Sequence, residues 1–175
     1  MNQDAKKMVK VALTLALIAS GAALIVSSLN LFTAPRIEAN RLAKEKSGLE
    51  AIFAKAEIGE SSNIDKGSLK KYWPVVLEDG ESARIYSASG KNGYGAVSIL
   101  IGVYSDFTLG RMEILENTET YGPTLQKGYV APYQYADNAE DRAIALEDVS
   151  CGATYGAKLI KGMVLEAVAH YKEAQ

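Results

Sequence analysis

Residues 11–32 consist of VALTLALIASGAALIVSSLNLF, a run of 22 residues without one charged side chain. As an α-helix with a rise of about 1.5 Å per residue, this run would reach roughly 33 Å, enough to cross the hydrocarbon core of a bilayer. The apolar part of a cleaved signal peptide is shorter, about 7–15 residues, and is followed by a cleavage site of small residues. We therefore predict a retained transmembrane helix over residues 11–32, preceded by a short N-terminal segment, residues 1–10.

The charges beside this helix leave its orientation open. Basic residues stand on both sides of it, Lys6, Lys7 and Lys10 before and Arg36, Arg41, Lys44 and Lys46 after. Because the positive-inside rule compares the basic residues of the two flanks, it does not decide which flank is cytoplasmic.

Helical spacing of apolar residues continues beyond the membrane run. It predicts a juxtamembrane helix within residues 33–58, after which polar residues and glycines from Gly59 to Gly67 interrupt the pattern. The rest of the chain, residues 59–175, forms the predicted outer domain.

The outer domain shows strand patterns first and a helix pattern last. Strands are predicted at residues 72–78, 83–88, 94–104 and 109–116, and an amphipathic helix at 155–171. The run 94–104 is apolar on both of its alternating faces, which is typical of a central strand covered on both sides. The order of elements indicates an α+β domain with a mainly antiparallel sheet and flanking helices.

Composition excludes several classes of function. The formal net charge is -2, and no basic cluster offers a surface for nucleic acid. Cys151 is the only cysteine and His170 the only histidine, so the usual zinc ligands and a Ser-His-Asp triad are missing. We interpret His170 as a solvated or partly packed helix residue. The chain therefore has no catalytic nucleophile or acid-base pair of its own, and any chemistry is expected to come from a cofactor.

A run of small residues, DVSCGAT from Asp148 to Thr154, directly precedes the predicted last helix. Unpaired backbone N–H groups and the positive end of the helix dipole would meet there, an arrangement that suits a phosphate ester. The alternative is an ordinary helix cap, for which Ser150 or Thr154 is a suitable residue.

This run resembles the FMN-binding domain shared by the RnfG and NqrC subunits of ion-translocating redox complexes. In that family an aspartate precedes Ser/Thr-Gly-Ala-Thr, and a flavin transferase esterifies the last threonine with FMN. The resemblance implies that Thr154 carries FMN through a phosphoester, which makes the chain a flavoprotein and phosphoprotein. It implies further that Asp148 is recognised by the transferase. Ser150, Cys151, Gly152 and Ala153 would lie beside the cofactor, with Cys151 replacing the usual Ser or Thr.

Two further stretches extend the resemblance, Gly93-Tyr94-Gly95 and the run ENTETYG from Glu116 to Gly122. The family's counterpart of the second usually reads Glu-His-x-Glu-Thr-Pro-Gly, so Asn117 and Tyr121 depart from it. Glu119 and Thr120 are expected to contact the edge of the isoalloxazine ring, with turn formation as the alternative. Expected neighbours of the flavin are Tyr121, Tyr129, Tyr133 and Tyr135 for stacking and Leu125, Leu159 and Met163 for apolar contact.

The resemblance implies an electron-transfer subunit of a membrane ion-translocating oxidoreductase of the Rnf type, ferredoxin:NAD+. RnfG is favoured because the chain is short for NqrC. The N-terminus would be cytoplasmic and the FMN domain would lie outside the inner membrane. Partners would be the other membrane subunits of the complex, the flavin transferase and membrane lipid. An NqrC-like subunit, a stand-alone membrane flavoprotein and a flavin-free membrane scaffold remain as alternatives.

Overall fold

A computed structural model describes residues 3–131 and 152–174 of the chain. The chain divides into two compact units, Met1–Ala43 and Lys44–Gln175. The first helix, α1 (Gln3–Ile52), contains Pro35 and contributes residues to both units. It ends at Ile52 rather than at residue 58, since Lys55 adopts a left-handed backbone conformation with φ of 62° that a helix does not continue through.

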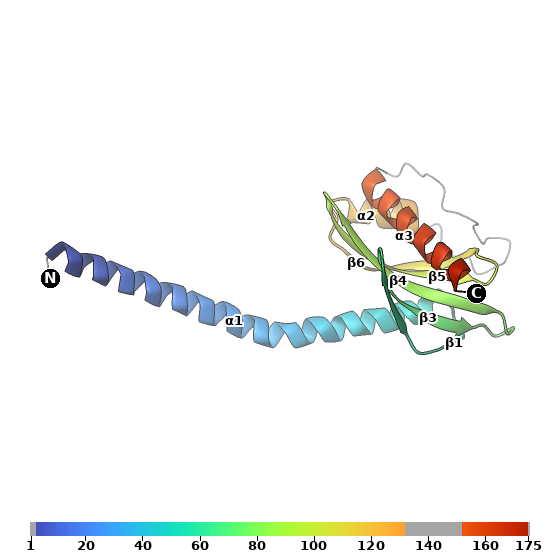
Figure 1. Cartoon of the computed structure of the whole chain (residues 1–175), viewed down its shortest axis with the longest axis horizontal. Coiled ribbons are helices and arrows are strands. Elements are labelled where there is room, and N and C mark those ends of the chain that lie inside the picture. Colours follow the sequence, from blue (N-terminus) through green and yellow to red (C-terminus); the bar gives the residue numbers. More distant parts are fainter. Residues whose placement is uncertain (1–2, 132–151, 175) are drawn as a thin grey trace. The chain divides into compact units, whose positions relative to one another are not determined.

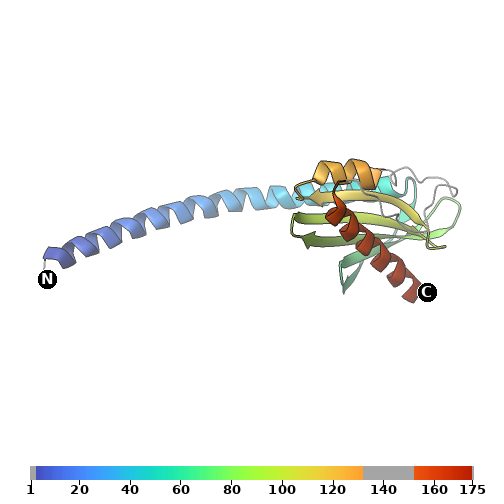
Figure 2. The same cartoon turned by 90° about the horizontal axis from the view of Figure 1, so that it is seen from above.

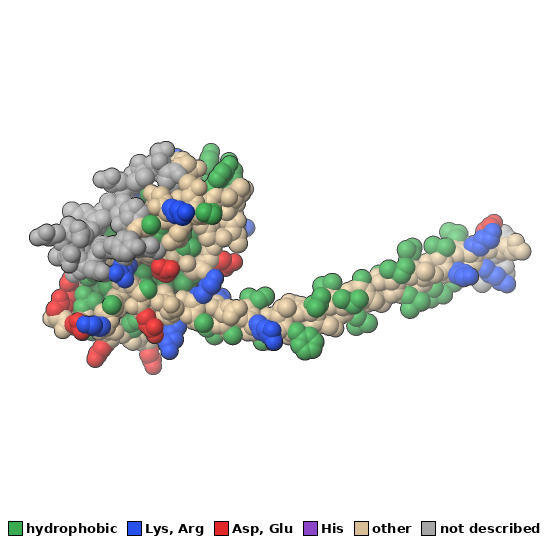
Figure 3. Space-filling model, turned by 180° about the vertical axis from the view of Figure 1, so that it is seen from behind, with side chains coloured by type: hydrophobic (Ala, Val, Ile, Leu, Met, Phe, Trp, Pro, Cys, Tyr) green, Lys and Arg blue, Asp and Glu red, His purple; other side chains and the backbone are tan. Residues whose placement is uncertain are grey.

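The part of α1 in the first unit is long and apolar enough to cross a membrane. Large hydrophobic side chains such as Leu17, Ile25 and Phe32 are exposed there, as the space-filling view shows along the helix (Figure 3). A core helix of a soluble domain would bury such side chains against protein. Their exposure therefore fits a single-pass helix that faces lipid.

The second unit is built on an antiparallel sheet (Figures 1 and 2). In the described residues its six strands are β1 (Glu57–Ile58), β2 (Ser62–Lys66), β3 (Leu69–Val76), β4 (Ser82–Asn92), β5 (Gly95–Tyr104) and β6 (Leu109–Asn117). The strand order is β1-β3-β4-β5-β6, and β2 also pairs with β3. The predicted α+β class is confirmed. β1 and β2 were not predicted, because their sequences are polar and they form by pairing with β3.

β5 is covered on both faces, as its sequence predicts. Val97, Ile99, Ile101 and Val103 face a core cluster that includes residues of the last helix α3 (Thr154–Glu173), the short helix α2 (Gly122–Leu125) and the π-helical turn η1 (Gln126–Val130). Leu100 and Tyr104 face a second cluster with Ile52 and Phe53 at the end of α1. Full burial of each such aliphatic side chain contributes about 1.5–3 kcal/mol. The sheet therefore holds the start of α3 against one face and the end of α1 against the other.

Candidate functional site

A hollow of about 210 Å³ lies at the start of α3. Three segments that are distant in sequence line it: Tyr94 from the β4–β5 hairpin, Glu119 and Tyr121 from the loop after β6, and residues 152–156. Among these are five of the residues that the sequence predicts for a cofactor site, namely Gly152, Ala153, Thr154, Glu119 and Tyr121. The fold therefore brings the two motifs of the resemblance to one place.

Thr154 is the first residue of α3, and its side chain is exposed at the hollow. The residue that caps the helix is Ala153, and the cap makes no side-chain hydrogen bond. The interpretation of Thr154 as an ordinary N-cap is therefore wrong. Its hydroxyl stands in the first turn, where the backbone N–H groups of a helix lack partners within the helix.

Gly152 forms a left-handed turn two residues before Thr154. Its φ of 77° is a left-handed conformation that favours glycine, and the nearest atom to a Cβ added there would be Cγ2 of Thr124 at 3.6 Å. Among the described residues, a side chain at this position would therefore meet only Thr124, at ordinary van der Waals distance.

Asn117, which stands where the resembling family usually has histidine, shapes the loop after β6. Its amide oxygen accepts a hydrogen bond from the Glu119 N–H at 3.0 Å, and its amide nitrogen donates to the Gly122 carbonyl at 3.3 Å. One side chain therefore joins both ends of the turn. This arrangement gives Asn117 a structural role in the loop.

The β4–β5 hairpin positions the same loop from the other side. The Thr120 N–H donates to the Tyr94 carbonyl at 3.1 Å, and the Thr118 N–H donates to the Ala96 carbonyl at 2.9 Å. The Thr120 hydroxyl also lies 3.4 Å from the Tyr94 carbonyl, to which it donates. Thr120 thus takes part in the turn, and it does not line the hollow.

Glu119 is a nearly buried carboxylate, with 8% of the residue exposed. One of its oxygens accepts a hydrogen bond from the side-chain amide of Asn92. Its other oxygen lies against Gly156 in the first turn of α3, where any Cβ would overlap it. The positive end of the helix dipole stabilises a negative charge in this position. Leu125 is fully buried behind the same glycine.

Aromatic rings border the hollow at its open side. The ring centroids of Tyr94 and Tyr155 are 5.2 Å apart, and those of Tyr94 and Tyr121 are 6.5 Å apart. Sequence reasoning missed Tyr155 and did not assign Tyr94 to the cofactor. Their positions in the sequence could have indicated both residues, since Tyr155 follows Thr154 directly and Tyr94 is the centre of the Gly-Tyr-Gly motif.

Other predicted neighbours lie elsewhere. Tyr129 is 1% exposed and belongs to the core, so it is not available for stacking in the hollow. Leu159 and Met163 pack over Gly90 of β4. Outside the described residues lie Tyr133, Tyr135, Asp148, Ser150 and Cys151.

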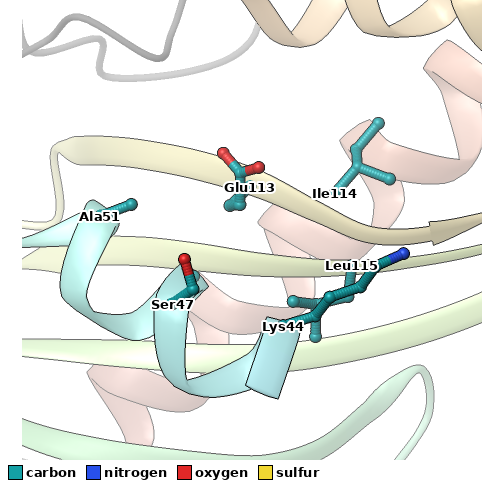
Figure 4. A pocket seen from close by; sticks show the side chains of 7 residues that line it. Lys44, Ser47, Ala51, Glu113, Ile114 and Leu115 are labelled. Atoms are coloured by element: carbon teal, nitrogen blue, oxygen red, sulfur yellow. The ribbon is translucent and has the colours of Figure 1, made fainter. Parts of the chain in front are cut away.

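A second hollow, of about 260 Å³, lies between the last turns of α1 and β6. Figure 4 shows Lys44, Ser47 and Ala51 on the helix and Glu113, Ile114 and Leu115 on the strand. It contains none of the residues that the sequence predicts for a cofactor site. The hollow at Thr154 is therefore the better candidate.

A comparison with known protein families gave a match at the N-terminal end of the chain. A family model described as the RnfG N-terminal region matches residues 1–52. Residues 1–52 of this chain are thus similar to the N-terminal region of RnfG. The match confirms the predicted resemblance, favours RnfG, and supports an electron-transfer subunit of an Rnf complex at a membrane. It ends before the hollow at Thr154. None of the curated proteins compared with the chain matches it.

Proposed function

We propose that this RnfG-like chain is an electron-transfer subunit of a ferredoxin:NAD+ oxidoreductase of the Rnf type, and that it carries FMN on Thr154 through a phosphoester. One observation carries the proposal: an exposed threonine hydroxyl, unused by the helix cap, stands at the first residue of α3 beside a hollow. The RnfG match over residues 1–52 supports the assignment to an Rnf-type complex.

The residues around Thr154 fit FMN by their chemistry. The N-terminus of α3 offers backbone N–H groups and a positive dipole end for the phosphate. The tyrosines at the hollow offer apolar faces to an aromatic ring. The phosphate and the ring of FMN would therefore each find suitable groups beside Thr154.

The Glu119 carboxylate sets a limit on where the phosphate lies. Both groups would be negative, and Glu119 is already held against Gly156 and Asn92. Because like charges in a poorly solvated site repel each other, Glu119 would disfavour a phosphate close to its carboxylate. Its part in the site would therefore be to exclude a second negative charge from the inner wall of the hollow.

FMN supplies the redox chemistry when bound, since a flavin exchanges one or two electrons. The chain's own residues bind and orient it, and the described residues offer no group of three or more His, Cys, Asp or Glu that would hold a metal. α1 confines the domain to a membrane surface and so raises its effective concentration beside partner subunits. In this proposal the N-terminus is cytoplasmic, the domain lies outside, and Asp148 is recognised by the flavin transferase.

The test is to produce the full chain together with a flavin transferase and to measure its intact mass and its flavin fluorescence on a denaturing gel. We expect an FMN adduct on the unmutated chain and on Thr154→Ser, which keeps a hydroxyl. Thr154→Val should lose the adduct completely, because no oxygen is left to form the ester.

Thr124→Val is the matched control, since Thr124 is an exposed threonine next to Gly152. We expect it to keep the adduct. An unmutated chain without the adduct would support a flavin-free scaffold, and fluorescence that persists in Thr154→Val would place the attachment elsewhere.

A further inference from the structure

The surface of the second unit exposes few large apolar side chains, and most of them lie together. In its described residues these are Val76, Tyr94, Tyr121, Tyr155 and Leu165, and the three tyrosines all line the hollow beside Thr154. They are 47%, 54% and 63% exposed. An apolar cluster of this kind on a small domain marks a place where something binds.

The three rings come from separate elements and are held there by the backbone. Tyr94 occupies the two-residue tip of the β4–β5 hairpin, where its N–H donates to the side-chain oxygen of Asn92 at 2.8 Å. Tyr121 lies within the turn that Asn117 organises, and Tyr155 is in the first turn of α3. Because the main chain fixes all three positions, the cluster is part of the fold.

The size of the hollow indicates how a ligand would use these rings. Pockets that bury a drug-sized ligand measure about 300–1,000 Å³, and this hollow measures about 210 Å³. An FMN attached to Thr154 would fill it with only part of its length. The remaining part would extend over the exposed tyrosines.

We propose that Tyr94, Tyr121 and Tyr155 form a stacking surface that holds the isoalloxazine ring of FMN attached to Thr154. This inference rests on the proposed function. The ring of Tyr94 lies 5.2 Å from that of Tyr155 and 6.5 Å from that of Tyr121, separations that aromatic pairs prefer, so the three rings form one continuous aromatic surface.

Tyr94 is the best position for a test, because its side chain is exposed while its backbone makes the structural contacts. Full-length chain loaded with FMN would be compared with Tyr94→Leu and Tyr94→Phe by fluorescence anisotropy and emission yield of the attached flavin. A tyrosine stacked on a flavin quenches its emission and limits its rotation. Loss of one such contact shifts the equilibrium between the stacked and the free ring about two- to tenfold.

We expect Tyr94→Leu to raise the emission and to lower the anisotropy in the native state. Tyr94→Phe should keep the anisotropy, since it keeps the ring. Tyr72→Leu is the tyrosine control, because Tyr72 packs against Tyr86 and His170 away from the hollow, and it should leave both signals unchanged. Denaturation should make all variants alike.

The outcomes separate this inference from the proposed function. An FMN adduct on Thr154 whose anisotropy and emission are the same in Tyr94→Leu, in Tyr155→Leu and in the unmutated chain overturns the stacking surface and leaves the attachment intact. Equal changes in Tyr72→Leu and Tyr94→Leu would overturn it as well, because they would report a general loosening of the domain. Absence of an adduct from the unmutated chain overturns the proposed function itself.

Discussion

At the scale of the residue, Gly95 is a position beside the site that does not accept a side chain. Its φ is 150°, and a Cβ added there would lie 2.5 Å from the Thr118 carbonyl oxygen and 2.6 Å from the Glu119 backbone. The atoms in the way are main-chain atoms, which cannot rotate aside. Gly95→Ala would therefore push the loop after β6 away from the hairpin.

We predict that Gly95→Ala lowers the free energy of unfolding by about 1–3 kcal/mol, measured by urea denaturation. Gly93→Ala is the matched control, because nothing lies within 4 Å of a Cβ at that position. It should change stability by less than about 0.5 kcal/mol. Equal losses in the two variants would contradict the steric argument.

Protonation of His170 is expected to make the stability of the domain depend on pH. Its ring lies against those of Tyr72 and Tyr86, with Nδ1 3.3 Å from the Tyr86 hydroxyl, so it is the partly packed residue that the sequence predicts. Burial lowers the pKa of His170 below its ordinary value of 6.5, and the positive charges of Arg84 and Lys66 lower it further. The folded state therefore favours the neutral imidazole.

Because the unfolded chain binds a proton at His170 more readily, stability should fall as the pH falls below about 6.5 toward the lower pKa of the folded state. Above this window both states are neutral at His170 and no such dependence remains. Urea denaturation of His170→Gln between pH 7 and pH 5 should show a shallower decline than the unmutated chain. Parallel declines would show that other groups cause the pH dependence.

At the scale of the element, the last turns of α1 belong to the domain as well as to the anchor helix. The Glu45 carboxylate, 7% exposed, pairs with the Lys71 ammonium of β3, which also lies 4.7 Å from the centre of the Trp73 ring. Gly48 allows close approach to Leu100, and Ile52 is 2% exposed in the second core cluster. These contacts make residues 44–52 part of the folded unit.

We predict that a fragment of residues 44–175 folds cooperatively and that a fragment of residues 53–175 is less stable by at least about 2 kcal/mol. The shorter fragment loses Ile52 and leaves Lys71 without the Glu45 carboxylate. Chemical denaturation of the two purified fragments measures the difference. Equal stability would show that the end of α1 only connects the anchor to the domain.

At the scale of the whole molecule, one chain combines an exposed apolar helix with an α+β domain. The basic residues on both sides of the membrane run do not set its direction, so orientation is the quantity to measure. We predict that alkaline phosphatase fused to the C-terminus is active in cells, because this enzyme folds only outside the cytoplasm. A fusion at the N-terminus should be inactive, and the reverse result would place the domain in the cytoplasm.

The sequence by itself determined those features that depend on neighbouring residues. A run of 22 uncharged residues is long enough to span a bilayer, alternation on both faces of residues 94–104 requires a covered strand, and a 3.6-residue stripe makes the last helix amphipathic. It also supplied Thr154 through resemblance, at what proved to be the start of α3.

Only the tertiary structure decided which residues stand around Thr154. Tyr94 and Glu119 are 60 and 35 positions away in sequence, and they reach the start of α3 because backbone hydrogen bonds join the β4–β5 hairpin to the loop after β6. The polar strands β1 and β2 likewise exist through pairing with β3. Local propensity carries no record of such long-range contacts, and for this reason the sequence named Thr154 as the expected attachment residue but did not assign Tyr94 to the same site.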